Sequence, residues 1–360
     1  MQKNIDINVT NREVKLFVRL KDQIREHVDK YMESLSNIDD IIGKSNLSIM
    51  YDNHNNHIKF MSTVFTLNST AMLQNSIPWV YHTYLSRGFS YDYFLIVLEV
   101  WKSSIQIYMG IEDSKNILDI YQWMIDSHLD MIELSKNQNI IENVNPQYEK
   151  SRAEFIKAIL QGNYNKGLSI VKEIINKEEG LEVLYMSLIE PAMYQIGYLW
   201  ENNNISIAEE HLATSIVSRI IATIYSEFMN TEFNNSLGII TSAPNEYHEL
   251  GGRMLADLLD INGWNIQFYG SNTPEKDLID VLIKNSPVFL GVSVTMCSNI
   301  DKIVELITNI RKTKSLENLK IIVGGQAFNT DPEIWKRTGA DAYSKNFKES
   351  LNIINTWKNT

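Results

Sequence analysis

The 360-residue chain has 44% hydrophobic residues, a formal net charge of −11 and one cysteine, Cys297. Its length and composition favour two or three ordinary globular domains, and its acidic balance argues against a direct nucleic-acid partner, because a surface that binds phosphates is normally basic. A single cysteine excludes an intramolecular disulfide and any metal site built from several cysteines.

The beginning of the chain is polar and lacks the apolar core of a signal peptide. The longest apolar stretch, Val288–Cys297, is far shorter than the roughly 20 residues that a membrane-spanning helix needs. We therefore expect a cytoplasmic protein without membrane contact.

Residues 1–145 are predicted to form an all-helical domain. Apolar residues recur at three- and four-residue spacing over 14–35, which gives one apolar helix face, and the more apolar segment 94–111 is typical of a core helix. No basic recognition helix and no strand-turn-strand wing is recognisable in this region.

The polar run 51–57 has no apolar periodicity and predicts a loop. Its two histidines, His54 and His57, could suggest a metal site, but no third ligand lies nearby in the sequence. We expect both side chains to be solvated.

Aromatic residues are dense over 78–94, which contains Trp79 and several tyrosines. One interpretation is a helix-turn-helix corner whose aromatic rings pack in the core. The other is a binding surface for a ligand or for a partner protein.

A second helical region is predicted at 148–230, between polar linkers at Asn143–Pro146 and Asn230–Ser236. Four helical patterns, punctuated by glycines, indicate a four-helix bundle; these glycines are Gly162, Gly180 and Gly197.

Residues 237–357 change rhythm, because short β-branched runs alternate with helical patterns. This alternation predicts a doubly wound, Rossmann-like parallel sheet, in which ligands bind beyond the carboxyl ends of the strands. The predicted strands are 237–243, 264–270, 288–295, 319–325 and 339–345, and the predicted helices between them include 251–263, 274–285 and 300–313.

The loop after the first predicted strand contains Glu246 and His248. A histidine there can present one ring nitrogen to a metal while the carboxylate holds the other nitrogen. Gly251 follows at the start of the next helix and allows a bulky ligand to approach the backbone. Taken alone, however, a loop histidine is more often structural or solvated.

Two further loops are expected at the same edge of the sheet. The third strand ends with hydroxyl side chains at alternate positions, Ser293 and Thr295, and the fourth ends with Gly324 and Gly325. Together with the histidine loop, this order resembles the cobalamin-binding domain shared by methionine synthase, the corrinoid shuttle proteins and the base-off mutases.

That resemblance implies a cobalamin cofactor with His248 as the lower ligand of cobalt. Ser293 and Thr295 would line the slot that receives the benzimidazole tail, and the two glycines would leave space for it. The family usually has aspartate where this chain has Glu246, although the photoreceptor branch also uses glutamate.

The predicted bundle contains Trp200, then nine residues, then Glu210 and His211. This spacing resembles the cap of the adenosylcobalamin-dependent photoreceptors, which are light-responsive transcriptional repressors. The resemblance implies that Trp200 packs on the adenosyl group, with Glu210 and His211 beside it. The alternative is that Trp200 is a bundle core residue and that Glu210 and His211 form a solvated helix start.

Two departures limit the resemblance. The photoreceptors have a histidine directly after the tryptophan, where this chain has Glu201. Water or His211 is then left as the partner of cobalt once the adenosyl group is lost. The photoreceptors also carry a DNA-binding domain that residues 1–145 do not resemble.

The sequence therefore indicates a cobalamin-binding sensor rather than an enzyme, with no catalytic residues of its own. Adenosylcobalamin is the expected cofactor, and residues 1–145 are expected to contact an unidentified regulatory protein or kinase, or to form a homo-oligomer. The alternative is a corrinoid methyl carrier that uses methylcobalamin. A radical mutase is not expected, because no substrate barrel of about 250 residues fits in the chain.

Overall fold

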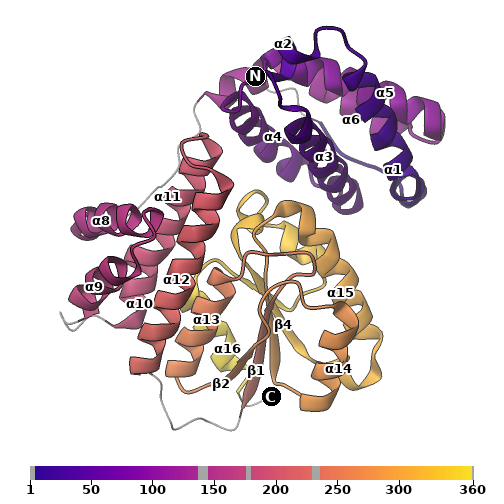
Figure 1. Ribbon diagram of the computed structural model, residues 1–360. Coiled ribbons are helices and arrows are strands. Elements are labelled where there is room, and N and C mark those ends of the chain that lie inside the picture. The colour runs from indigo at the N-terminus through magenta and orange to yellow at the C-terminus, as the bar shows by residue number, and fades with distance from the viewer. Residues whose placement is uncertain (1–4, 137–144, 176–179, 229–235, 359–360) are drawn as a thin grey trace. The chain divides into compact units, whose positions relative to one another are not determined.

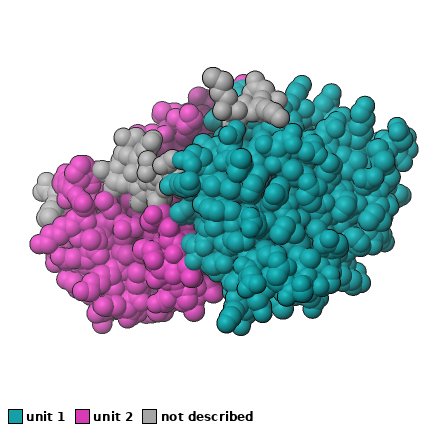
Figure 2. Space-filling model, turned by 90° about the horizontal axis from the view of Figure 1, so that it is seen from above, with its two compact units in different colours: residues 1–138, 296–301, 328–334 teal, residues 139–295, 302–327, 335–360 magenta. Residues whose placement is uncertain are grey.

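The computed structural model describes residues 5–136, 145–175, 180–228 and 236–358 (Figure 1). Most of the two predicted linkers, Asn143–Pro146 and Asn230–Ser236, lies outside these residues. The chain divides into two compact units (Figure 2). Unit 1 comprises 1–138, 296–301 and 328–334, and unit 2 comprises 139–295, 302–327 and 335–360.

The N-terminal part of unit 1 is helical throughout its described residues, as predicted. The first helix begins with a capping box, in which the Thr10 hydroxyl accepts from the Glu13 N–H and the Glu13 carboxylate accepts from the Thr10 N–H. The helices are α1(Asn11–Glu33), α2(Ile38–Ile42), α3(Leu47–Leu67), α4(Thr70–Leu85), α5(Tyr91–Met109), α6(Lys115–Asp126) and α7(His128–Ser135).

The prediction of a solvated loop at 51–57 is wrong, because this run lies inside α3. The ring of His54 is fully buried, and its Nδ1 lies 2.6 Å from Asp29 Oδ1. The Tyr121 hydroxyl and His57 Nε2 are hydrogen-bonded over 2.9 Å, and burial lowers the pKa of His57 to about 3. Polar side chains of distant helices therefore supply the hydrogen bonds that water would otherwise make.

The aromatic run 78–94 forms the corner between α4 and α5, and four of its rings are part of the core. Tyr81 stacks on Phe94 with ring centroids 3.8 Å apart, and Phe89 packs edge-on against Tyr93 at 4.8 Å. All four side chains are buried. These rings agree with the core interpretation, whereas Trp79, Tyr84 and Tyr91 of the same run are half-buried.

The helical part of unit 2 is a bundle of four rods, as predicted. One rod combines α10, η2 and α11, where η2 is a π-helical turn. Gly162, with φ +73°, follows the end of α8, but Gly197 lies inside α11 and does not punctuate the chain. The elements are η1(Pro146–Tyr148), α8(Glu149–Leu160), α9(Tyr164–Ile175), α10(Leu181–Leu184), η2(Tyr185–Ile189), α11(Glu190–Glu201) and α12(Ile207–Phe228).

The rest of unit 2 is a five-stranded parallel sheet in the order β2-β1-β3-β4-β5, which confirms the predicted doubly wound fold. Figure 1 shows α13 and α16 on one face of the sheet and α14 and α15 on the other. The strands are β1(Leu237–Ser242), β2(Asn265–Phe268), β3(Phe289–Ser293), β4(Lys320–Gly324) and β5(Ala342–Ser344). The helices are α13(Leu250–Ile261), α14(Glu275–Asn285), α15(Ile300–Lys312) and α16(Phe347–Thr356), and short 3-10 turns are η3(Cys297–Asn299), η4(Lys314–Leu316), η5(Gln326–Asn329) and η6(Ile334–Arg337).

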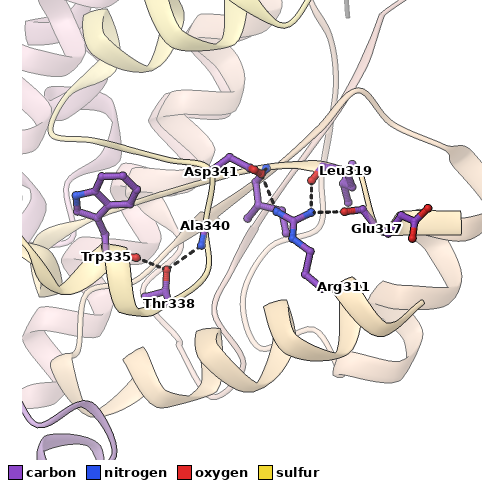
Figure 3. Close-up of polar contacts among 8 residues, drawn as sticks. Arg311, Glu317, Leu319, Trp335, Thr338, Ala340 and Asp341 are labelled. Carbon is purple, nitrogen blue, oxygen red and sulfur yellow. Dashed lines mark hydrogen bonds and ion pairs between the residues drawn. The ribbon is translucent and has the colours of Figure 1, made fainter. Parts of the chain in front are cut away.

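Arg311 of α15 ties together the chain segments that lead into β4 and β5 (Figure 3). Its guanidinium donates to the Leu319 carbonyl over 2.6 Å and to Asp341 Oδ2 over 2.7 Å. Asp341 Oδ2 also accepts from the Ile321 N–H at 2.7 Å. These bonds lie at the amino ends of the strands, opposite the edge at which the loops after β1, β3 and β4 lie.

The bundle and the sheet of unit 2 share one apolar core, into which two polar pairs are set. The fully buried Tyr185 of η2 donates to Asp257 Oδ2 over 2.8 Å, and Tyr225 of α12 donates to Asp260. Both carboxylates belong to α13. Burial raises the pKa of Asp257 to about 6, against the opposing effects of the Tyr185 hydrogen bond and the Arg253 charge.

We expect Asp257→Asn to stabilise the protein at pH 7.5. Because the folded-state pKa is raised, the penalty of the buried charge is fully present above pH 6 and disappears as the pH falls from 6 towards 4. Asparagine keeps an acceptor for Tyr185 without the charge. After allowance for partial exposure, the gain in the free energy of unfolding is about 1–2 kcal/mol, measurable by urea denaturation.

The same variant should flatten the pH dependence of stability between pH 4 and 6, since the titrating group is gone. Asp280→Asn, on the exposed face of α14, is the matched control and should change stability by less than about 0.5 kcal/mol. Loss of stability in Asp257→Asn at pH 7.5 would contradict the assigned burial penalty.

Candidate functional site

The loop after β1 holds Glu246 and His248 in a fixed pair. Glu246 Oε1 lies 2.5 Å from His248 Nδ1 and also accepts from the His248 backbone N–H at 3.1 Å. The Glu246 side chain is 1% exposed, whereas the His248 side chain is 57% exposed. With Nδ1 held by the carboxylate, Nε2 is the nitrogen available to a metal.

Glu246 also joins this loop to the end of β3. Its other oxygen, Oε2, accepts from the Thr295 backbone N–H at 3.0 Å. The hydrogen bond that His248 makes to the Glu246 carboxylate raises the pKa of His248, whereas burial lowers it. The negative charges of Glu246 and Glu210 raise this pKa further. The buried carboxylate therefore orients the histidine ring and fixes two of the predicted loops together.

The start of α13 is fixed to the same loop. The Ser242 hydroxyl, at the end of β1, donates to the His248 carbonyl over 3.1 Å. A Cβ on Gly252 would lie 3.3 Å from the Phe268 ring and 3.6 Å from the Ser293 side chain, whereas a Cβ on Gly251 would meet nothing within 4 Å. The protein's own packing is therefore tight at Gly252 and open at Gly251.

The ends of β3 and β4 lie side by side, as predicted, because Ser293 pairs with Gly324 in the sheet register. A Cβ on Gly324 would lie 3.1 Å from the Ser344 carbonyl oxygen. Gly325 has φ +106°, and a Cβ there would lie 2.3 Å from the Val294 carbonyl oxygen. The need for glycine at 325 thus follows from the protein's own backbone.

The three predicted cap residues lie on two elements of the bundle. Trp200 is half-buried at the end of α11, beside Glu201, and Glu210 and His211 lie near the start of α12. The Thr214 hydroxyl donates to Glu210 Oε1 over 2.8 Å, which holds that carboxylate, while His211 is exposed. The bundle that carries these residues shares an apolar core with α13, which begins two residues after His248.

Sequence reasoning missed Ser242, which holds the backbone of the histidine loop. No signal in the sequence marks Ser242, whose bond to the backbone of His248 depends on the path of the loop.

Family comparison identifies the elements that build this site. The B12 binding domain model matches residues 236–351, and a second B12 binding domain model matches residues 151–225. This part of the chain is a B12-binding domain with its helical cap. The chain is accordingly a cobalamin-binding protein, and the resemblance inferred from the sequence is confirmed.

Two relatives show how widely such domains are used. The chain is 20% identical over 203 residues to the HTH-type transcriptional repressor CarH of Myxococcus xanthus, a match that spans 56% of this chain and 66% of the repressor. It is 21% identical over 206 residues to dimethylamine corrinoid protein 1 of Methanosarcina mazei, spanning 56% of this chain and 94% of that protein.

Among solved structures, the monomethylamine corrinoid protein of Methanosarcina barkeri superposes with a TM-score of 0.51 at 19% identity. The match covers 57% of this chain and 98% of that chain. At this identity the likeness confirms the fold of cap and sheet. No helix in the described parts of the chain combines the length and apolar character needed to cross a bilayer.

The donor set of the B12-binding domain fits a cobalt ligand. An imidazole whose second nitrogen is fixed by a buried carboxylate is a typical metal ligand, and His248 is exposed enough to be reached. Among the described residues no cluster of three or more histidine, cysteine or acidic side chains could hold a bare metal ion. The Glu246–His248 pair therefore fits a site in which the protein supplies one imidazole nitrogen to the metal of a cofactor.

Proposed function

We propose that this cobalamin-binding protein is an adenosylcobalamin-dependent light sensor that signals through protein–protein contacts. One observation carries the proposal: the His248–Glu246 pair leads directly into α13, and α13 shares an apolar core with the bundle whose cap motif contains Trp200 and Glu210. A corrin between them would have an imidazole on one face and the cap on the other. Such a site suits a cofactor with a bulky upper group.

When bound, adenosylcobalamin supplies a cobalt–carbon bond that visible light cleaves. We assign His248 Nε2 to the lower position, with Glu246 keeping the ring in the required tautomer. Ser293, Thr295, Gly324 and Gly325 remain the proposed lining of the slot for the nucleotide tail.

On the cap side, we assign Trp200 to pack on the adenosyl group and Glu210 and His211 to lie beside it. Loss of packing beneath Trp200 would leave a cavity, and packed helices respond to a cavity by shifting to another discrete arrangement. Because Glu201 replaces the histidine of the photoreceptors, water or His211 is the proposed partner of cobalt after illumination.

The proposed output is a change in contacts made by the helical N-terminal region. Its described residues expose apolar side chains on several elements, including Ile107 at 65% and Leu129 at 77%. These are the candidate contacts for a regulatory protein, a kinase or a second copy of the chain. No nucleic-acid partner is proposed.

A corrinoid methyl carrier is the second candidate. It is favoured by the match over 94% of a dimethylamine corrinoid protein, and it would use the same His248–Glu246 pair with methylcobalamin. The Trp200 and Glu210 cap motif favours the sensor, since a methyl group needs little cover.

The deciding experiment loads the protein with adenosylcobalamin in the dark and records absorbance and size-exclusion profiles before and after green light. For a sensor we expect rapid photolysis together with a changed elution volume. If adenosylcobalamin does not bind while methylcobalamin binds and its methyl group passes to a thiol acceptor in the presence of a methyltransferase, the sensor proposal is refuted in favour of the carrier.

A further inference from the structure

The two tyrosine–aspartate pairs between the bundle and α13 are placed where they can govern the cap. Both tyrosines belong to the bundle, Tyr185 on η2 and Tyr225 on α12, and both aspartates belong to α13. Tyr185 donates to Asp257 over 2.8 Å and Tyr225 donates to Asp260. The aspartates are three residues apart and so lie on the same face of α13.

The surroundings of these pairs are apolar. Met254, Leu258 and Leu259 of α13 share a continuous hydrophobic core with residues of the bundle such as Ile216 and Ile221. Close packing resists gradual sliding, but apolar contacts have no fixed direction and can be satisfied in more than one discrete arrangement. Hydrogen bonds to half-buried carboxylates are directional, and breaking one leaves a charged acceptor with no donor. The pairs therefore set the seating of the bundle on α13.

The second structural feature is the π-helical turn that carries Tyr185. Its extra residue is accommodated by a bond from the Glu190 N–H to the Tyr185 carbonyl. One inserted residue rotates the following helix by about 100°, and α11, which follows directly, ends with Trp200 and Glu201. Tyr185, which bonds the π turn to α13, is therefore placed to influence the rotation of α11 and the direction in which Trp200 faces.

The third feature is the position of α13 itself. It begins at Leu250, two residues after His248, and its first turn packs closely against the sheet at Gly252. Ser242 additionally holds the His248 carbonyl. One rigid helix therefore connects the proposed lower-ligand loop to both tyrosine anchors.

We infer that Tyr185–Asp257 and Tyr225–Asp260 form a latch that seats the cap on α13 and thereby controls access to the upper face of a bound corrin. The first half of this inference concerns the protein alone; the second rests on the proposed function. With both bonds made, the π turn keeps Trp200 on the cofactor side. With both broken, the π turn can relax to α-helical geometry and the cap can leave the site.

The test uses substitutions that remove only the hydroxyls: Tyr185→Phe, Tyr225→Phe and the double variant. Tyr164→Phe is the matched control, because its hydroxyl bonds to Thr223 within the bundle at 2.9 Å and does not touch α13. In the protein without cofactor, amide hydrogen exchange of α11 and α12 should accelerate about tenfold in the double variant. The control should stay within twofold of the wild type.

The second measurement uses protein loaded with hydroxocobalamin and follows the rate at which azide binds on the upper face. We expect the double variant to bind azide about tenfold faster and the control to be unchanged. Unchanged hydrogen exchange in the double variant overturns the latch. Accelerated exchange with an unchanged azide rate overturns the control of access. If the wild type takes up no cobalamin, the proposed function and the control of access are refuted, while hydrogen exchange still decides whether the latch exists.

Discussion

Replacing His248 with alanine is expected to abolish the spectrum of cobalamin with a histidine as its lower ligand. The Glu246 carboxylate holds Nδ1 at 2.5 Å and leaves Nε2 as the coordinating atom, so alanine removes the ligand while the rest of the loop is kept. Loss of a residue that merely orients a metal ligand weakens binding by roughly 10–100-fold. Loss of the ligand itself should weaken cobalamin binding by at least about 100-fold. Absorbance titration measures both effects.

His211→Ala is the matched control, because His211 is an exposed histidine of the cap. It should leave the histidine-ligated spectrum unchanged in the dark. Free imidazole added to the His248→Ala variant should restore part of that spectrum, since the space of the ring becomes vacant. If the His248 variant keeps the histidine-ligated spectrum, the ligand has been assigned to the wrong residue.

The sequence was sufficient to predict the sheet and its ligand edge because the signals there are local. Buried parallel strands such as β1 and β3 need short β-branched runs, and the loops between strand and helix need glycines and polar residues. The order of these runs then places Glu246, Ser293 and Gly324 at one edge without any knowledge of side-chain contacts.

The sequence failed where distant residues decide the outcome. The run around His54 looked like a loop because it has no apolar period, yet Asp29 and Tyr121 stabilise its histidines inside a helical unit. The π turn at Tyr185 also has no local signature, and its tyrosine bonds to Asp257, 72 residues later in the chain. Polar residues that are buried by tertiary contacts break the alternation of apolar and polar positions from which helices are predicted, so the sequence pattern alone does not reveal them.

Gly325→Ala is expected to cause the largest loss of stability in the sheet domain. Its φ of +106° is unfavourable for any residue with a side chain, and the added Cβ would lie 2.3 Å from the Val294 carbonyl oxygen. Because that neighbour is backbone at the end of β3, it cannot rotate away. We expect the free energy of unfolding, measured in urea, to fall by more than about 3 kcal/mol.

Gly251→Ala is the matched control for Gly325→Ala, since its Cβ would meet nothing within 4 Å and the residue lies in a helix. It should change stability by between zero and a gain of about 1 kcal/mol. A loss below 1 kcal/mol in Gly325→Ala would mean that the backbone at the end of β3 can move to accommodate the added Cβ.

The Gly325→Ala variant also bears on cofactor binding. The Val294 backbone requires a glycine at 325 whether or not a nucleotide tail enters the slot, so this glycine alone is no evidence for the slot. Weaker cobalamin binding by this variant must therefore be judged against its folded fraction, and only a loss in the folded protein counts as evidence for the slot.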